Sequence, residues 1–170
     1  MGWLPDGFHH PEWAELVTGH HMRPIRASDV KIDYSAVMGS RVRLWQRYGE
    51  AWGWPPATMT LEQDRADLAH HEAEMTRGEA FNYAVLDEDE SELLGCVYID
   101  PPPAATRPGR PPAAPRPGVP PAATRPGADA VVSWWVVDHA VGTELERALA
   151  EFVPRWLRDT WHFKSVEFAP

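Results

Sequence analysis

The fold is decided by the stretch Ala130-Val-Val-Ser-Trp-Trp-Val-Val137 and by the pattern that follows it. These eight residues are almost all apolar, which predicts a strand buried on both faces. From about Glu144 to Thr160, apolar residues recur at every third or fourth position, so we expect a helix with one apolar face. Thr143-Glu-Leu-Glu146 at its start has the residue types of a capping box. The stretch therefore predicts a strand, a tight loop around Gly142 and a long amphipathic helix.

The remaining elements combine helices with further strands. Helices are expected from Ser28 to Gly39, from there to Gly49, and from the capping box Thr60-Leu-Glu-Gln63 to Gly78. Strands are expected at Met22–Ile25, Phe81–Leu86, Leu93–Ile99 and Lys164–Phe168. This order predicts the α/β class, with an α+β arrangement of helices around one mixed sheet.

Residues 101–128 differ in composition from everything around them. They hold 11 of the 18 prolines, and a nine-residue unit of mainly Pro, Ala, Arg and Gly runs three times. Such a segment buries too little apolar surface to offset its ordering entropy, so we predict a disordered Pro-rich insert. Its R-P-x-x-P-like stretches fit a proline-rich ligand, but the interpretation that we favour is an expanded loop without function. The insert interrupts a single domain at 20–168, which an N-terminal extension at 1–19 precedes.

Composition excludes several classes of protein. The 170 residues carry a formal charge of −9, which argues against a nucleic-acid partner. No apolar run approaches the ~20 residues of a membrane helix, and the N-terminus lacks the pattern of a secretory signal. The single cysteine, Cys96, excludes a disulfide framework, and its mid-strand position predicts burial. We therefore expect a cytoplasmic protein without a membrane partner.

Three His-His pairs raise the question of a metal site. His71-Glu-Ala-Glu-Met75 has a methionine where the H-E-x-x-H zinc motif needs its second histidine. His70 and Glu74 are correctly spaced, but two ligands do not make a closed site, so we predict no metal. The aromatic residues before the third helix either line a ligand pocket or pack in the core; they are Trp45, Trp52 and Trp54.

Three motifs lie on these elements in a characteristic order. They are His21-Met-Arg-Pro-Ile-Arg-Ala-Ser-Asp29, Leu94-Gly-Cys-Val-Tyr-Ile99, and Val132-Ser-Trp-Trp-Val136 followed by Gly142-Thr-Glu-Leu145. In this order they resemble the GNAT superfamily of acyl-CoA-dependent N-acetyltransferases, over about residues 20–168 without the insert. The resemblance implies a GNAT-like acyl-CoA N-acyltransferase fold that is short at its C-terminal end.

The resemblance also implies a cofactor site for acetyl-CoA. In the family, the pantetheine arm bonds the backbone of a splayed strand, and the pyrophosphate lies on N–H groups of a glycine-rich loop at a helix N-terminus. The matching loop has His139 where Gln or Arg is usual and Glu144 where a second Gly or Ala is usual. The implied cofactor-binding residues are Val136, Val137, His139, Gly142 and Thr143.

The catalytic residues are less apparent. Many GNAT enzymes carry a catalytic glutamate at the position where this chain has Val131. The residues that could take its place are Tyr98 and Asp100, our catalytic candidates, and His139 is a further candidate. The implied reaction moves an acetyl group to a primary amine on a small molecule or a protein. The alternative is a catalytically inactive binding or interaction module of the same fold. We favour the enzyme, and the oligomeric state, a homodimer included, stays open.

Overall fold

The computed structural model describes residues 3–102 and 127–169, without the side chains of residues 51 and 52. The predicted disorder of the Pro-rich insert therefore concerns residues that lie almost entirely outside the described part. The helices are α1 (Val30–Gly39), α2 (Arg41–Trp52), α3 (Leu61–Thr76) and α4 (Glu144–Asp159), with short 3₁₀ helices η1 (Ala27–Asp29) and η2 (Asp138–Ala140). The strands are β1 (Ala14–Glu15), β2 (His21–Pro24), β3 (Phe81–Leu86), β4 (Leu93–Asp100), β5 (Ala130–Val136) and β6 (Val166–Phe168).

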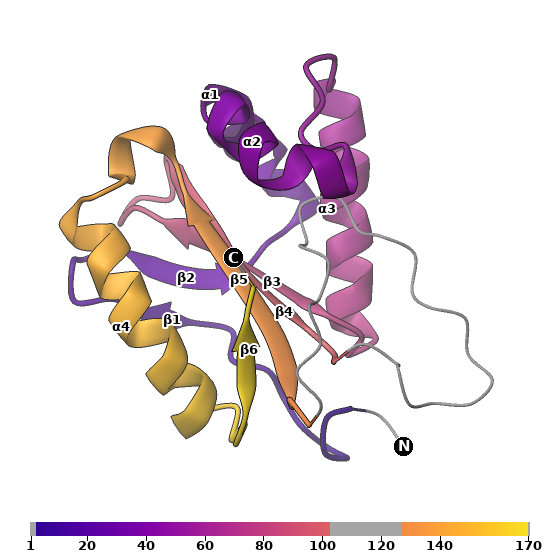
Figure 1. The fold of residues 1–170 in the computed structure, drawn as a ribbon, viewed down its shortest axis with the longest axis vertical. Helices are drawn as coiled ribbons and strands as arrows, with labels where there is room; N and C mark the ends of the chain where they lie inside the picture. Colours follow the sequence, from indigo (N-terminus) through magenta and orange to yellow (C-terminus); the bar gives the residue numbers. More distant parts are fainter. Residues whose placement is uncertain (1–2, 103–126, 170) are drawn as a thin grey trace.

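The six strands form one mixed sheet in the order β1-β2-β3-β4-β5-β6. Neighbouring strands are antiparallel except β5 and β6, which are parallel. Figure 1 shows α1, α2 and α3 on one side of the sheet and α4 on the other. This confirms the predicted α/β class and the mixed sheet. Strand β1, which the sequence analysis did not predict, adds the described part of residues 1–19 to the sheet edge.

The two predicted capping boxes have different outcomes. At α3 the box is formed, because the Gln63 N–H donates to the Thr60 hydroxyl at 3.2 Å and the Thr60 N–H donates to the Gln63 side chain at 2.9 Å. At α4 the prediction is wrong. The Thr143 hydroxyl donates to the Ala140 carbonyl at 2.6 Å, so it is turned away from the helix.

Burial on the α4 side follows the predicted apolar stripe. Leu149, Val153 and Leu157 are completely buried, and the Trp156 ring meets Tyr83 of β3 edge-on at 4.9 Å. Burying large apolar side chains stabilises the fold by roughly 1.5–3 kcal/mol each. The α4 helix is therefore fixed against the sheet along its whole length, and its first turn is held close to the end of β5.

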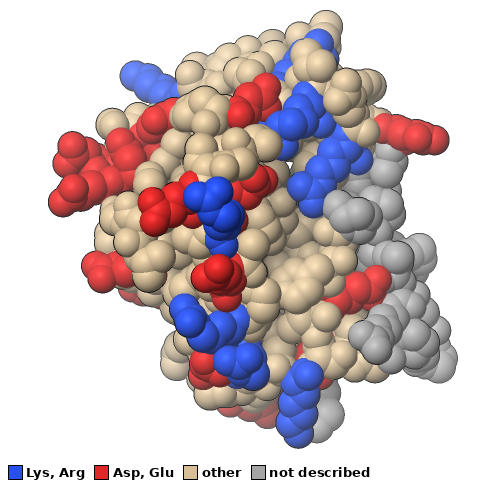
Figure 2. All heavy atoms as spheres, turned by 60° about the vertical axis from the view of Figure 1, so that its left-hand side comes forward, with Lys and Arg blue, Asp and Glu red and all other residues tan. Residues whose placement is uncertain are grey.

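The surface carries charges of both signs. Figure 2 shows Lys and Arg side chains interspersed with Asp and Glu on the side that carries α4. None of the helices within residues 3–102 and 127–169 is both long and apolar enough to cross a membrane.

Candidate functional site

Strands β5 and β6 pair over only part of their length. Their parallel ladder joins Ala130–Val132 to Val166–Phe168, and its last bond runs from the Ala169 N–H to the Val132 carbonyl at 2.9 Å. Within the described residues, no strand pairs with this edge of β5 beyond Val132. Because alternate residues of a strand point the same way, the carbonyls of Trp134 and Val136 face the same open edge.

A pocket of about 210 Å³ lies at this unpaired edge, and we call it the edge pocket. Its apolar wall comes from β5 and β6, through residues that include Trp134, Val136 and Phe168. Its polar residues are Arg43 and Arg47 from α2 and Glu146 from α4. The edge pocket thus joins a strand edge, an apolar wall and two cations.

The two arginines bind the backbone of the open edge. Arg47 donates to the Trp134 carbonyl at 3.0 Å, and its guanidinium carbon lies 4.9 Å from the centre of the Tyr48 ring. Arg43 donates from Nη2 to the Val136 carbonyl and from Nε to the Asp138 carboxylate, the latter at 2.8 Å. The carbonyls that a further strand would bind are therefore satisfied by arginine side chains.

The loop between β5 and α4 uses nearly all of its own backbone N–H groups. From Val137 to Thr143, six of the seven are hydrogen bonded. The exception among the seven is the N–H of His139. The other six donate, in the order of the chain, to Leu94 O, Ser40 Oγ, Val137 O, Asp138 O, Glu146 Oε2 and Ala140 O. The 2.6 Å bond from the Gly142 N–H to the Glu146 carboxylate closes the turn at the residue whose φ is +74°. This loop therefore has few N–H groups to offer an anion.

The first turn of α4 differs from the loop. No residue of the described part accepts a hydrogen bond from the backbone N–H groups of Glu144, Leu145 or Glu146. Such N–H groups, together with the helix dipole, favour anions. The carboxylates of Glu144 and Glu146 stand at the same helix end, however, and oppose an added negative charge.

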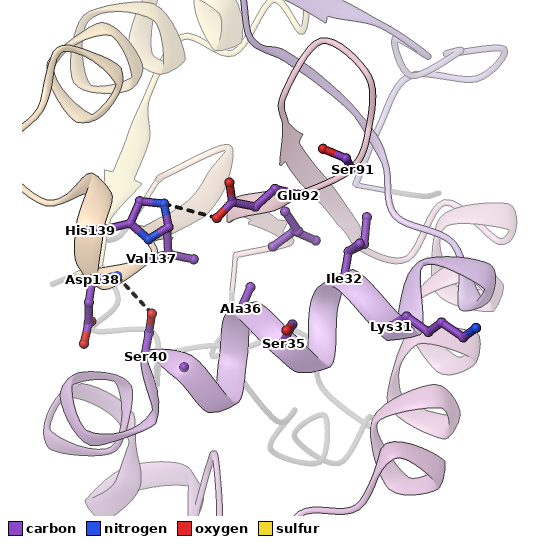
Figure 3. A pocket seen from close by; sticks show the side chains of 12 residues that line it. Lys31, Ile32, Ser35, Ala36, Ser40, Ser91, Glu92, Val137, Asp138 and His139 are labelled. Carbon is purple, nitrogen blue, oxygen red and sulfur yellow. Dashed lines mark hydrogen bonds and ion pairs between the residues drawn. The ribbon is translucent and has the colours of Figure 1, made fainter.

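A second pocket, of about 270 Å³, lies between α1, the start of β4 and η2, and we call it the hairpin pocket (Figure 3). His139 and Glu92 both line it and are in contact, with Nε2 and Oε1 3.1 Å apart. Next to this pair, the Asp138 N–H donates to the Ser40 hydroxyl at 2.9 Å. Lys31 extends away from the His139–Glu92 pair (Figure 3).

The predicted cofactor residues do not lie together. Val136 lines the edge pocket, whereas Val137 and His139 line the hairpin pocket. Gly142 and Thr143 form the turn before α4, with their N–H groups occupied as described. The strand–loop–helix unit is present, but its predicted cofactor residues line two different cavities, and Gly142 and Thr143 line neither.

The predicted catalytic residues line neither pocket. The Tyr98 side chain is buried, and its hydroxyl accepts a hydrogen bond from the Trp135 indole at 3.0 Å. Burial raises the pKa of Tyr98 well above its ordinary value. Asp100 ends β4, is half-buried, and is the register partner of Val131 on β5. Asp100 is therefore the more accessible of the two.

A buried acidic pair was not predicted. Asp33 of α1 and Asp64 of α3 are both buried, and their carboxyl groups hydrogen bond to each other. Burial raises the pKa of Asp64 to about 6 and raises that of Asp33 well above its ordinary range. The Cys96 thiol lies 3.9 Å from the Asp33 carboxylate, and Cys96 is buried as predicted.

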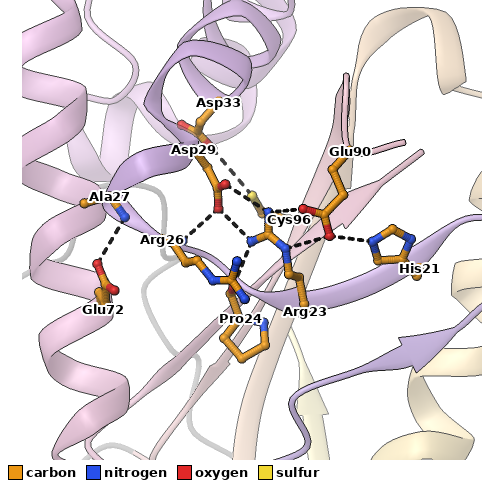
Figure 4. Close-up of polar contacts among 10 residues, drawn as sticks. All are labelled: His21, Arg23, Pro24, Arg26, Ala27, Asp29, Asp33, Glu72, Glu90 and Cys96. Atoms are coloured by element: carbon orange, nitrogen blue, oxygen red, sulfur yellow. Dashed lines mark hydrogen bonds and ion pairs between the residues drawn. The ribbon is translucent and has the colours of Figure 1, made fainter. Parts of the chain in front are cut away.

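A second polar cluster holds the start of α1 (Figure 4). Arg23 is 4% exposed and binds Asp29 through two bonds of 2.8 and 2.9 Å and Glu90 through two of 2.9 and 2.7 Å. The hydrogen bond from Arg23 lowers the pKa of Glu90 to about 2. His21 also contacts Glu90 at 2.9 Å. This cluster joins β2, η1 and the β3–β4 turn, so its role is structural.

The tryptophans that were candidates for a ligand pocket differ in their burial. Trp54 packs in the core, with ring centres 5.8 Å from Tyr48 and 6.4 Å from Trp135, whereas Trp45 is exposed. The Trp52 side chain lies outside the described part. Among the described residues, no group of three or more His, Cys, Asp or Glu side chains is arranged to bind a metal ion.

Comparison with solved structures identifies similar folds. RimL, a ribosomal L7/L12 α-N-protein acetyltransferase in complex with coenzyme A, matches with a TM-score of 0.60 and 16% identity over 88% of this chain and 70% of that one. The ribosomal-protein-S5-alanine acetyltransferase from Vibrio fischeri matches with a TM-score of 0.56 and 16% identity, over 89% and 66%. The GNAT domain of S. lividans PAT matches with a TM-score of 0.50 and 19% identity, over 90% and 77%.

The similarity to these solved structures is a similarity of fold. Neither a comparison with protein-family models nor one with curated proteins produces a match. This chain spans between 66% and 77% of the length of the three solved structures. The strand order, the partial β5–β6 pairing and the placement of α4 agree with the resemblance seen in the sequence. The chain therefore has the fold of the GNAT N-acetyltransferases.

Proposed function

We propose that this protein transfers an acetyl group from acetyl-CoA to a primary amine. The observation that carries the proposal is the open edge of β5, where the parallel partner β6 ends at Phe168. A chain with amide groups can add to such an edge as an extra strand does. A solved structure of the same fold binds coenzyme A, which supports the choice of ligand.

The edge pocket suits the pantetheine arm of the cofactor. The carbonyls of Trp134 and Val136 lie at the open edge and, once Arg47 and Arg43 leave them, would accept hydrogen bonds from the amide N–H groups of the arm. Phe168 and the Trp134 ring would pack against its apolar parts. Acetyl-CoA, when bound, supplies the acetyl group as a thioester. The edge pocket would orient that arm along β5. Of the predicted cofactor residues, Val136 is the one that we propose to contact the cofactor directly.

Asp100 is the residue we propose to accept the proton that the amine loses. It stands beside Val131 in the β4–β5 register, and Val131 is the position at which the resemblance expects a glutamate. A carboxylate one strand away from that position can serve the same purpose, directly or through one water molecule. Tyr98 is the second candidate, although its hydroxyl is buried against Trp135.

The acceptor is proposed as a primary amine. Two of the solved structures are named for acetylation of ribosomal proteins, at an S5 alanine and at the α-amine of L7/L12. Protein N-terminal amines therefore belong in the first acceptor screen, next to small-molecule amines.

Thermal unfolding with acetyl-CoA tests the proposal. A ligand at 100 times its Kd stabilises the folded state by about 2.7 kcal/mol, so the melting temperature should rise with cofactor concentration. An unchanged melting temperature at millimolar acetyl-CoA would contradict the proposal. It would favour the alternative, a binding module without catalysis, which the occupied N–H groups of Val137–Thr143 support.

A further inference from the structure

The loop before α4 is poorly suited to a pyrophosphate. Six of its seven N–H groups already have acceptors within the protein. The first turn of α4 has N–H groups without an acceptor in the described part, but the carboxylates of Asp138, Glu144 and Glu146 stand near this helix end and oppose an anion there, and Glu146 also lines the edge pocket. A diphosphate at this end of β5 would therefore need positive charge from another element of the fold.

Helix α2 supplies positive charge at the right place. Arg43 and Arg47 are four residues apart, so they lie on one face of the helix, on successive turns about 5–6 Å apart. Both line the edge pocket, and Arg43 remains 34% exposed. Two guanidinium groups on one helix face suit the two phosphoryl groups of a diphosphate, because each guanidinium can bind a phosphoryl group through two donors.

The Nη groups of these two arginines donate to neutral carbonyls. Arg47 donates to a neutral carbonyl, that of Trp134, and Arg43 uses Nη2 for the neutral carbonyl of Val136. Both bonds are already charge-assisted through the guanidinium, and a phosphate oxygen would add the attraction of a negative charge, which a carbonyl lacks. Arg43 also binds Asp138 through Nε, and that bond does not involve Nη2. An incoming phosphate can therefore take the Nη groups while Nε stays on Asp138.

We propose that Arg43 and Arg47 bind the phosphate groups of coenzyme A in place of the loop, an inference that rests on the proposed function. In doing so they leave the carbonyls of Trp134 and Val136, which then accept the amide N–H groups of the pantetheine arm. Phosphate binding and arm binding thus promote each other. Binding of the phosphates releases the two carbonyls from the arginines, and the pantetheine arm then binds the same carbonyls.

The test compares two ligands that share the arm and differ in the phosphates. Coenzyme A is titrated by calorimetry and pantetheine by ligand-observed NMR, for the full chain and for the double variant Arg43→Gln and Arg47→Gln. Glutamine removes the charge and, because it is shorter, leaves both carbonyls free. We expect the double variant to bind coenzyme A at least about tenfold more weakly, the factor that the loss of one charge-assisted bond would produce. Pantetheine binding should not weaken, because the carbonyls that accept its amide N–H groups stay in place.

Arg41→Gln is the matched control, because Arg41 is on the same helix and does not line the edge pocket. It should leave the affinity for coenzyme A unchanged. If the double variant does not fold, Arg47→Gln alone serves, since Arg47 is exposed and its side-chain hydrogen bond is to the Trp134 carbonyl.

Three results overturn the inference. They are unchanged coenzyme A binding in the variant, an equal loss for both ligands, and a loss in Arg41→Gln as large as that in the double variant. These differ from a failure of the proposed function, in which the unaltered protein binds neither coenzyme A nor pantetheine. That last result would remove the inference as well.

Discussion

The carboxyl groups of Asp33 and Asp64 hydrogen bond to each other in the core between α1 and α3. Such a bond needs one proton, so the pair exists as one acid and one carboxylate or as two acids. Burial raises the pKa of both groups, that of Asp64 to about 6. The pair therefore makes the stability of the α1–α3 layer depend on pH.

The sign of that dependence follows from the raised pKa values. An aspartate of the unfolded chain loses its proton near pH 4, whereas Asp64 keeps its proton up to about pH 6. The stability that the pair contributes is thus complete below pH 4 and is lost as the pH rises through 6. Asp64→Asn removes this ionisation, so we expect its melting temperature at pH 8 to exceed that of the unaltered protein.

The measurement is thermal unfolding of both proteins between pH 5 and pH 8. The difference in melting temperature should grow with pH. Glu62→Gln, on the exposed side of the same helix, is the control and should show no such trend. A difference for Asp64→Asn that stays constant with pH would contradict the account.

The Arg23–Glu90 pair has the opposite dependence. The pKa of Glu90 is lowered to about 2 by Arg23, so its contribution is present above pH 4.5 and is lost as the pH falls toward 2. Removing one partner of a buried arginine leaves donors unsatisfied, and Asp29 still holds the other side of the guanidinium. We expect Glu90→Gln to lower the unfolding free energy at pH 7 by about 2 kcal/mol.

Urea unfolding at pH 7 and pH 3 checks this value. The cost of Glu90→Gln should be smaller at pH 3 than at pH 7. Glu88→Gln, in the same turn and exposed, should cost less than about 0.5 kcal/mol at either pH. Equal costs for the two variants would show that the pair contributes no stability.

Much of the fold was predictable because side-chain periodicity reports which face of an element is buried. The pattern at 130–160 predicted β5 and α4 within one or two residues of their observed ends. The burial of Asp33 and Asp64 was also indicated by the sequence, through the spacing of these residues from apolar ones. Asp33 stands between Val30 and Val37 on one helical face, and Asp64 precedes the buried Leu68 by four residues.

The edge pocket was less predictable from the sequence. Its main polar contacts are from Arg43 and Arg47 to backbone carbonyls, and backbone acceptors leave no mark on side-chain patterns. Which edge of β5 stays unpaired depends on where β6 ends and how the strands diverge. The failed capping box at Thr143 has a similar cause, because the residue types suit the box but the preceding turn offers the hydroxyl a nearer acceptor.

The close approach of β5 to Gly95 of β4 predicts that a side chain added at Gly95 destabilises the protein. A Cβ at this position would stand 2.1 Å from the Trp135 carbonyl oxygen, a backbone atom that cannot move without shifting β5. We expect Gly95→Ala to destabilise the protein by about 3 kcal/mol, the upper range of overpacking. Gly39→Ala, where a Cβ meets nothing within 4 Å at the end of α1, should be neutral or stabilising. A Gly95→Ala variant as stable as Gly39→Ala would contradict the strand register.

Asp100→Asn tests the proposed proton acceptor. Because a positioned base contributes 10²–10⁴-fold, we expect kcat for acetyl transfer to fall at least about a hundredfold. The affinity for coenzyme A should be unchanged, since Asp100 does not line the edge pocket. A steady-state assay and a calorimetric titration separate the two quantities. If Tyr98→Phe gives the loss of kcat and Asp100→Asn does not, Tyr98 has the role.

Coenzyme A is proposed to bind along the open edge of β5. Backbone amide NMR of the labelled protein during a coenzyme A titration tests it most directly, because each residue reports separately. The account predicts that the largest shifts occur at Trp134 and Val136 and at Arg43 and Arg47, with small ones at Lys31 and Ser91 in the hairpin pocket. Shifts confined to the hairpin pocket, or no shifts at millimolar coenzyme A, would contradict it.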